Sequence, residues 1–286
     1  MCKIHINIQM KLFPNAKINI GLNIVEKRTD GYHNIETVFY PIPLQDILII
    51  NKEANTEPVD NFSGYKYSDS GIIASENPEQ NLVVKAFRLL QKNYNIQGVS
   101  IELNKRIPFG AGLGGGSSDA AFTLKALNEL FQLNLSFEQL EMYAGKLGAD
   151  CPVFIQNKPV FATGIGNIFT PLNLSLSGYY LVLVKPEIHV STPVAYAKIK
   201  AKNPQHALID SIAEPIENWK SLIQNDFEQP VFEQYPLLRN IKQQMYERGA
   251  IYASMSGSGS SVYGIFKTKP VDLKEFENYF TFIDRF

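Results

Sequence analysis

A glycine-rich segment at residues 108–119, reading PFGAGLGGGSSD, is the feature that most constrains how this chain can fold. Five of the seven residues from 110 to 116 are glycine, and apolar residues follow at helical spacing as far as Phe131. Glycine allows the backbone to approach a ligand closely. A helix N-terminus offers free N–H groups and a partial positive charge, which together suit phosphate. The segment therefore predicts a phosphate-binding loop that opens a helix over residues 117–131.

Two common phosphate loops do not fit this segment. A P-loop ends in Gly-Lys-Ser/Thr, and no lysine stands at the corresponding place. A dinucleotide-binding fingerprint expects an acidic residue at a strand end about 20 positions further on. Glu138 and Glu141 lie near that distance, but on a predicted helix. A flexible turn that happens to precede a helix remains the alternative interpretation.

Residues 16–24 alternate between aliphatic and mostly polar side chains, which predicts a strand with one buried face. Lys17 and Asn19 share the face away from the aliphatic residues. A solvated lysine is the usual interpretation of such a position. The alternative is a fixed cation beside a transferring phosphate or a reacting hydroxyl.

The remaining patterns mix short strands with helices in both halves, which predicts an α+β fold. Strands are predicted at residues 34–39, 45–50, 99–103, 179–184, 253–255 and 262–266. Helices are predicted at residues 81–94, from Ser136 to Gly148, 193–200 and 236–249. Residues 51–71 are interpreted as a polar surface excursion. A domain boundary is predicted within residues 175–178.

Composition argues against several classes of protein. Of 286 residues, 27 are Lys or Arg and 28 are Asp or Glu, so nothing suggests a nucleic-acid or membrane surface. Two distant cysteines form no disulfide framework, and a reducing cytoplasm is expected. The N-terminus lacks the apolar run of a signal peptide, and no stretch approaches the roughly 20 apolar residues of a membrane span.

Four regions of the chain together resemble the GHMP kinases, the family of galactokinase, homoserine kinase and mevalonate kinase. They are residues 14–19 with 30–33, then 108–118, 148–152 and 256–260, reading PNAKIN with DGYH, PFGAGLGGGSS, GADCP and SGSGS. They occur in the family's order. The resemblance implies the two-domain GHMP kinase fold, with an ATP-binding domain at 1–174 and a substrate-side domain at 175–286.

The resemblance also implies roles for individual residues. Asp150 is expected to be the general base for a substrate hydroxyl, and Lys17 to orient it and to stabilise charge. A capping aspartate is the alternative for Asp150. ATP is expected with Mg²⁺, whose protein ligands stay open; Ser118 is one candidate. The implied ATP-binding residues are Pro108, Phe109, Gly110, Ala111, Gly112, Leu113, Gly114, Gly115, Gly116, Ser117 and Ser118. Gly257, Ser258 and Gly259 would lie on the phosphate side; they belong to the segment at 256–260, which resembles the family's third motif.

The opening segments resemble one branch of the family, whose acceptor is a cytidine diphosphate-linked methylerythritol of the non-mevalonate isoprenoid route. In that branch Tyr32, His33 and Tyr196 would hold the cytosine and Asn19 would bind substrate. Ordinary surface or core aromatics are the alternative, and residues 225–228 are interpreted as structural. The expected reaction is phosphorylation of the acceptor's 2-hydroxyl by a monomer or homodimer.

Two rival functions stay open. One is a GHMP kinase acting on mevalonate, homoserine or a sugar, and the segment at 30–33 argues against it because those substrates carry no base. The other is a catalytically inactive nucleotide-binding protein, and the presence of Lys17 and Asp150 argues against that.

Overall fold

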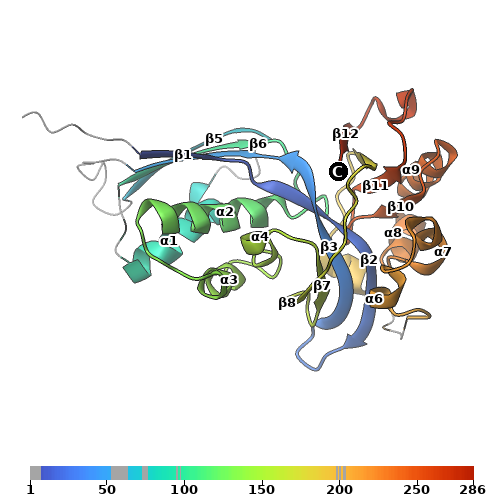
Figure 1. Ribbon diagram of the computed structural model, residues 1–286, viewed down its shortest axis with the longest axis horizontal. Coiled ribbons are helices and arrows are strands. Elements are labelled where there is room, and N and C mark those ends of the chain that lie inside the picture. The colour runs from blue at the N-terminus through green and yellow to red at the C-terminus, as the bar shows by residue number, and fades with distance from the viewer. Residues whose placement is uncertain are drawn as a thin grey trace, which may run out of the picture. The chain divides into compact units, whose positions relative to one another are not determined.

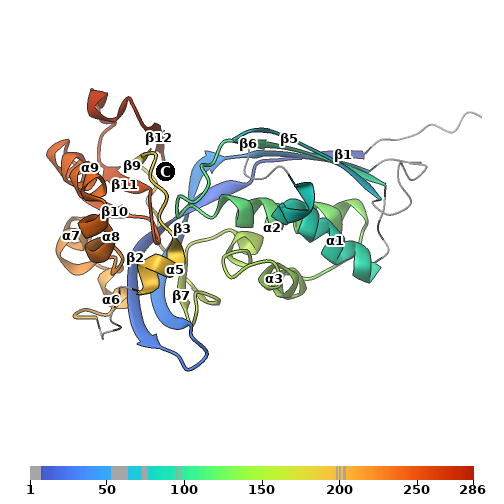
Figure 2. The ribbon, with the colours of Figure 1, turned by 180° about the vertical axis from the view of Figure 1, so that it is seen from behind.

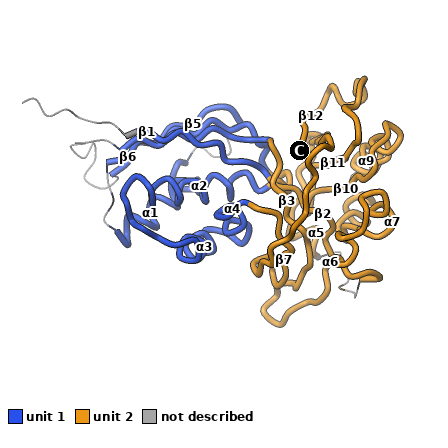
Figure 3. The backbone as a smooth tube through the Cα atoms, viewed as in Figure 1, with its two compact units in different colours: residues 1–16, 44–109, 114–157 blue, residues 17–43, 110–113, 158–286 orange. Residues whose placement is uncertain are grey.

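The computed structural model describes residues 8–52, 64–72, 77–94, 96, 98–197, 199, 201 and 204–286. The elements labelled in Figure 1 fall into two compact units, coloured separately in Figure 3. Unit 1 comprises Met1–Ala16, Leu44–Phe109 and Gly114–Asn157, and unit 2 comprises Lys17–Pro43, Gly110–Leu113 and Lys158–Phe286. The units do not follow chain order, and a domain boundary at residues 174 and 175 stays a prediction.

Unit 1 is a four-stranded sheet with helices on one face. The sheet has the order β1-β4-β6-β5, where β5 is parallel to β6 and the other pairs are antiparallel. Its strands are β1 Ile8–Leu12, β4 Ile47–Lys52, β5 Tyr65–Gly71 and β6 Val99–Lys105. Its helices are η1 Pro78–Gln80, α1 Leu82–Tyr94, α2 Gly115–Leu130, α3 Phe137–Gly145 and α4 Val153–Gln156. Figures 1 and 2 both show α2 running along the sheet with α1 beside it.

Helix α2 is central to unit 1 because it buries one long face. Ala120, Leu124 and Leu127 are fully buried, and α1, α3 and α4 all pack against this helix. Helix α3 begins with the predicted capping box, in which Ser136 and Gln139 satisfy each other's backbone N–H groups. It ends at Gly145 rather than at Gly148.

Unit 2 contains two further four-stranded sheets, β2-β3-β7-β8 and β10-β11-β9-β12. Their strands are β2 Asn15–Lys27, β3 His33–Gln45, β7 Val160–Thr163, β8 Ile168–Pro171, β9 Tyr180–Lys185, β10 Tyr252–Met255, β11 Val262–Phe266 and β12 Phe280–Arg285. Helices α8 and α9 pack together, and α9 lies against β10 and β11 (Figure 1). The helices are α5 Thr192–Ala197, α6 Leu208–Ser211, η2 Ile216–Asn218, α7 Trp219–Leu222, α8 Glu228–Gln234, α9 Pro236–Glu247 and η3 Lys274–Phe276.

Two predictions about local structure need correction, and a third falls partly outside the described residues. The strand at residues 16–24 is β2, but both of its faces are buried there, so its polar residues lie inside the protein. Part of the predicted surface excursion is a regular strand, β5, which pairs in parallel with β6; residues 53–63 lie outside the described part. The helix predicted to reach Lys200 is α5, and Lys200 itself is not among the described residues. None of the described helices is both long enough and apolar enough to cross a membrane.

Candidate active site

Lys17 is a buried lysine in unit 2, with only 4% of its surface exposed. Its Nζ donates to Asn19 Oδ1 at 2.6 Å and to the Gly112 carbonyl oxygen at 3.0 Å, and it lies 4.9 Å from the Phe39 ring centroid. A buried ammonium needs such acceptors because it has left water. The interpretation as a solvated surface lysine is therefore wrong. Lys17 is a cation fixed beside the glycine-rich segment.

Asn19 holds the position of this ammonium. Its Nδ2 donates to Thr37 Oγ1 at 2.9 Å, and Thr37 Oγ1 donates to the Gly21 carbonyl oxygen at 2.6 Å. With its amide nitrogen committed to Thr37, Asn19 presents its oxygen to Lys17. The Tyr263 hydroxyl also donates to the Asn19 carbonyl oxygen at 2.9 Å. The geometry thus gives Asn19 an orienting role toward Lys17, while its contact with substrate stays a prediction.

The middle of the glycine-rich segment lies against the third motif within unit 2. Ser256 Oγ donates to the Gly112 carbonyl oxygen at 2.8 Å and accepts from the Asn19 backbone N–H at 3.2 Å. Gly112 has φ +74°, and a Cβ there would lie 2.0 Å from the Ser256 carbonyl oxygen. Only glycine fits this approach. Ala111 and Leu113 are buried, and their carbonyl oxygens accept from Ser261 N–H and Lys17 N–H.

Asn225 holds the loop at residues 256–260 through its side-chain amide. Its Nδ2 donates to the carbonyl oxygens of Met255 and Gly257, each at 2.8 Å, and the residue is 3% exposed. Gly257 and Gly259 both adopt positive φ. Ser258 Oγ lies 2.9 Å from Thr192 Oγ1 at the start of α5. These bonds are consistent with a structural interpretation of residue 225, and what it supports is the loop at residues 256–260.

The ends of the glycine-rich segment, Pro108–Phe109 and Gly114–Ser118, belong to unit 1. Gly114 is the N-cap of α2 and has φ +69°. Because glycine has no side chain, it cannot accept a hydrogen bond from the N–H groups of the first turn. Such a terminus attracts anions. Ser118 Oγ is buried without a hydrogen-bond partner among the described residues.

Asp150 lies in the turn between α3 and α4 of unit 1 and is partly buried. Its neighbour Cys151 is fully buried. Burial raises the pKa of the Cys151 thiol to about 11, against a smaller lowering by a hydrogen bond with the Ser117 hydroxyl. The thiol therefore stays protonated at neutral pH and acts as a packing group. Its contact with Ser117 brings the Asp150 turn next to the start of α2.

The residues predicted to hold a base meet in one open pocket of unit 2, with a volume of ≈ 500 Å³. Tyr32, His33, Thr192 and Tyr196 line it. The His33 and Tyr196 rings are stacked at 4.9 Å between centroids, and Tyr196 also meets Phe227 edge-on. Tyr32 is 62% exposed, so its ring is open to a partner. This is a site where a flat ring can bind, and base recognition by these residues stays a prediction.

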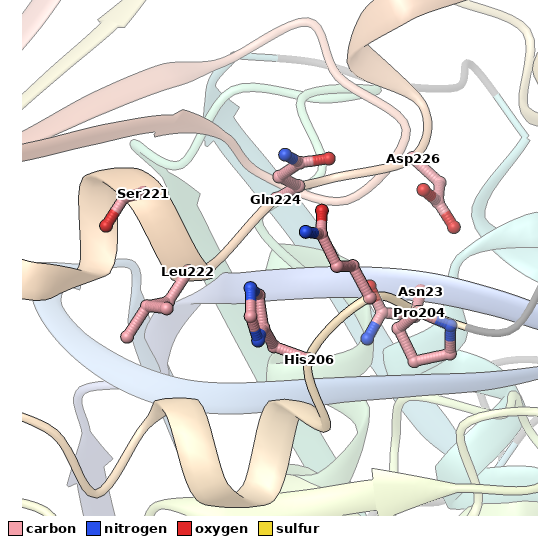
Figure 4. Close-up of a pocket in the computed structure, with 8 residues that line it drawn as sticks. Asn23, Pro204, His206, Ser221, Leu222, Gln224 and Asp226 are labelled. Atoms are coloured by element: carbon pink, nitrogen blue, oxygen red, sulfur yellow. The ribbon is translucent and has the colours of Figure 1, made fainter.

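A second, polar pocket of ≈ 190 Å³ lies elsewhere in unit 2 (Figure 4). It is lined by Asn23, His206, Gln224 and Asp226, among others. The Leu22 N–H donates to the Gln224 carbonyl oxygen at 2.9 Å, so this pocket borders the strand that carries Lys17. The described residues that line it include none of the predicted site residues.

The sequence did not indicate that Thr37, Phe39 and the Ser256 hydroxyl lie around Lys17 and Asn19. It also did not indicate the contact between Thr192 and Ser258. A hint was present in the polar alternation of residues 17 to 23, which a strand buried on both faces can satisfy only with internal partners. No group of three or more His, Cys, Asp or Glu side chains suited to a metal ion occurs in the described ranges.

Comparison with known proteins gives consistent matches along the chain. Residues 81–158 match the family described as GHMP kinases N terminal domain, and residues 206–276 match GHMP kinases C terminal. A 4-diphosphocytidyl-2-C-methyl-D-erythritol kinase of Bacteroides fragilis is 56% identical over 96% of this chain and 98% of its own. A relative of the same name from Bacteroides thetaiotaomicron is 55% identical over 90% of this chain and 92% of its own.

Solved structures agree with these matches. A crystal structure of 4-(cytidine 5'-diphospho)-2C-methyl-D-erythritol kinase is 34% identical, covers 90% of both chains and has a TM-score of 0.73. The mevalonate kinase of Methanococcus jannaschii, at 14% identity and a TM-score of 0.67, shares the fold.

Proposed function

Since this chain belongs to the GHMP kinases, and within them to the 4-diphosphocytidyl-2-C-methyl-D-erythritol kinases, we propose that it phosphorylates the 2-hydroxyl of 4-diphosphocytidyl-2-C-methyl-D-erythritol with ATP, in the non-mevalonate route to isoprenoids. The observation that carries the proposal is 56% identity over nearly the full length of a relative of that name. The aromatic pocket at Tyr32 supports it, because mevalonate, homoserine and sugars have no base to stack.

Asp150 acts as the general base in this proposal. Its carboxylate accepts the proton of the 2-hydroxyl while the hydroxyl oxygen forms a bond to the γ-phosphorus and the bond to the bridging oxygen of ADP breaks. The contact of Cys151 with Ser117 supports this role, because it keeps the Asp150 turn beside the helix end that suits phosphate.

Lys17 supplies a fixed positive charge for the transfer. Two oxygens, Asn19 Oδ1 and the Gly112 carbonyl oxygen, hold its ammonium, so little reorganisation is needed as charge develops. Lys17 therefore stabilises the negative charge that develops on the transferring phosphoryl group.

The glycine-rich segment holds the phosphates of ATP through backbone N–H groups at the start of α2, with Gly257–Gly259 on the phosphate side. Mg²⁺ accompanies ATP and neutralises phosphate oxygens. Ser118 is a suitable ligand for this ion. Its buried hydroxyl makes no hydrogen bond among the described residues, and Mg²⁺ prefers oxygen ligands.

The base of the acceptor binds between aromatic rings. Tyr32 is exposed and can cover one face of cytosine, whereas Tyr196 is backed by Phe227 and can form the other wall. His33 offers ring N–H and nitrogen atoms to the base edge once its stack on Tyr196 opens. We also propose that this protein is cytoplasmic and acts as a monomer or homodimer.

Purified protein with Mg-ATP and a panel of acceptors tests the assignment, with ADP release as the readout. Turnover is expected with the cytidine-bearing acceptor, and none with mevalonate, homoserine or galactose. Comparable turnover with any of these three would refute the proposed substrate. Absence of turnover with all four acceptors, despite ATP binding, would favour a catalytically inactive nucleotide-binding protein.

A further inference from the structure

Three ionisable side chains are buried together beside the glycine-rich segment in unit 1. Asp46, Lys105 and Asp119 are 0%, 3% and 2% exposed. The Lys105 ammonium contacts one carboxylate oxygen of Asp46 and lies 2.6 Å from Asp119 Oδ2. The three residues come from different elements: the link between β3 and β4, the end of β6, and the first turns of α2. The cluster therefore ties the N-terminal part of α2 to one end of the two central strands of the sheet, β4 and β6.

Asp46 also holds the chain that leads into the glycine-rich segment. Its Oδ1 accepts the backbone N–H groups of Arg106 at 2.5 Å and Ile107 at 2.8 Å. These two residues directly precede Pro108. Because a buried carboxylate with several donors sits in one orientation, Asp46 fixes the point where the segment begins.

The Lys105 ammonium reaches both ends of the segment that lie in unit 1. It is 5.2 Å from the Phe109 ring centroid, a cation–π distance. It would also lie 3.3 Å from a Cβ placed on Gly115, the first residue of α2. One side chain thus lies close to the segment both before and after its glycine-rich middle.

Such a cluster is a poor way to gain stability, because the cost of removing charges from water offsets most of their attraction. The cluster matters more for the position of the residues that it holds than for the stability of the fold. A shift of about 1 Å in a positioning group can change a rate or an affinity severalfold or more. The first-turn N–H groups of α2 need a defined direction to meet phosphate, and Asp119 attaches the cluster to the turn that directly follows.

We infer that Lys105, held by Asp46 and Asp119, is a positioning residue for the ATP phosphates: it sets the spacing between Phe109 and Gly115 and hence the shape of the phosphate loop. The inference rests on the proposed function, since it takes the start of α2 as the nucleotide site. Lys105 acts through the loop and touches no reacting atom.

Binding of a non-hydrolysable ATP analogue with Mg²⁺, measured calorimetrically without acceptor, tests this role. Lys105→Met keeps the length of the side chain but removes its charge, and it is expected to weaken the analogue by at least about tenfold. The KM of the acceptor should stay within about twofold, since its pocket lies in unit 2. Equal weakening of both ligands, or wild-type affinity in a folded Lys105→Met protein, would overturn the inference.

Lys52 provides the matched control at the other end of the same helix. Its ammonium lies 4.7 Å from the Phe131 ring centroid and 3.4 Å from the Leu130 carbonyl oxygen. Helix α2 has 16 residues and is about 24 Å long. Lys52→Met should therefore leave the analogue affinity unchanged. A similar loss in both lysine variants would mean that any change along α2 disturbs the site.

Two Asp119 variants decide the question if Lys105→Met does not fold. Asp119→Asn keeps an oxygen that accepts a hydrogen bond from Lys105, so its affinity for the analogue should stay within about threefold of wild type. Asp119→Leu removes that oxygen and should bind the analogue at least about fivefold more weakly. Equal affinity of the two variants would refute the role. Since analogue binding needs no acceptor, this result is independent of which acceptor the enzyme phosphorylates.

Discussion

Replacing Asp119 with asparagine is expected to abolish a pH dependence of folding that wild type carries near neutrality. Burial raises the pKa of Asp119 to about 8, with Lys105 opposing the shift and Asp46 adding to it. Among the described residues, Asp119 Oδ2 accepts one hydrogen bond, from the Lys105 ammonium, and Asp119 Oδ1 is buried without a partner. The folded protein therefore holds this carboxyl protonated, with one ionised carboxylate balancing the Lys105 ammonium.

The sign of the effect follows from proton binding in the two states. An unfolded aspartate ionises near pH 4, roughly its unperturbed value. Between that pH and about 8 the folded state binds one proton that the unfolded state does not, so stability falls as pH rises. The slope is about 1.4 kcal/mol per pH unit. Wild type should lose roughly 2.7 kcal/mol relative to Asp119→Asn between pH 5 and pH 7.

Urea unfolding at pH 5, 6 and 7 measures this difference. Trp219 is the sole tryptophan and is buried in unit 2, so its fluorescence is recorded together with far-UV circular dichroism, which also reports the helices of unit 1. Glu217→Gln is the surface control: its hydrogen bond to Lys267 lowers its pKa, so its difference from wild type should be flat over this range. A flat difference for Asp119→Asn as well, or wild type gaining on it with pH, would show that Asp119 is ionised in the folded protein.

The other predictions concern the proposed chemistry. Asp150→Asn should lower turnover by at least about 10²-fold in steady-state assays with both substrates still bound, because it removes the basicity and keeps the size; near-normal turnover would identify Asp150 as a structural cap. Lys17→Met should do the same, and the double variant should lose much less than the product of the two effects. Tyr32→Ala should weaken acceptor binding by roughly 1–3 kcal/mol with little change in the KM of ATP, so equal losses for both would assign Tyr32 to folding. Gly112→Ala would place a Cβ 2.0 Å from the Ser256 carbonyl oxygen, so nucleotide affinity measured by calorimetry should fall, and unchanged affinity would contradict the close packing of these loops.

Local signals in the sequence were sufficient for much of the fold. The period of two in residues 16–24 and the capping box at Ser136 depend on neighbours a few positions apart, and both match the structure. Strand β5 was missed because its residues YKYSDSG are polar or small, and only pairing with β6 makes them a strand. The burial of both faces of β2 was also missed, because alternation normally indicates one exposed face.

The candidate site likewise consists of features that the sequence reveals and features that only the fold reveals. Glycine density at residues 110–116, the Asp-Gly-Tyr-His segment and the Gly-Ala-Asp-Cys-Pro turn are contiguous, so the sequence alone points to each of them. The resemblance to one family of kinases likewise depends only on the residues of these segments and on their order along the chain.

Partnership between distant residues was decided by tertiary structure alone. Lys17 and the Gly112 carbonyl are 95 positions apart, and Asn19 and Ser256 are 237 apart. A side chain's burial and partners depend on what the folded chain places around it, and residue spacing does not encode this. For the same reason the sequence did not indicate that Asp119 is a buried carboxyl that shares Lys105 with Asp46.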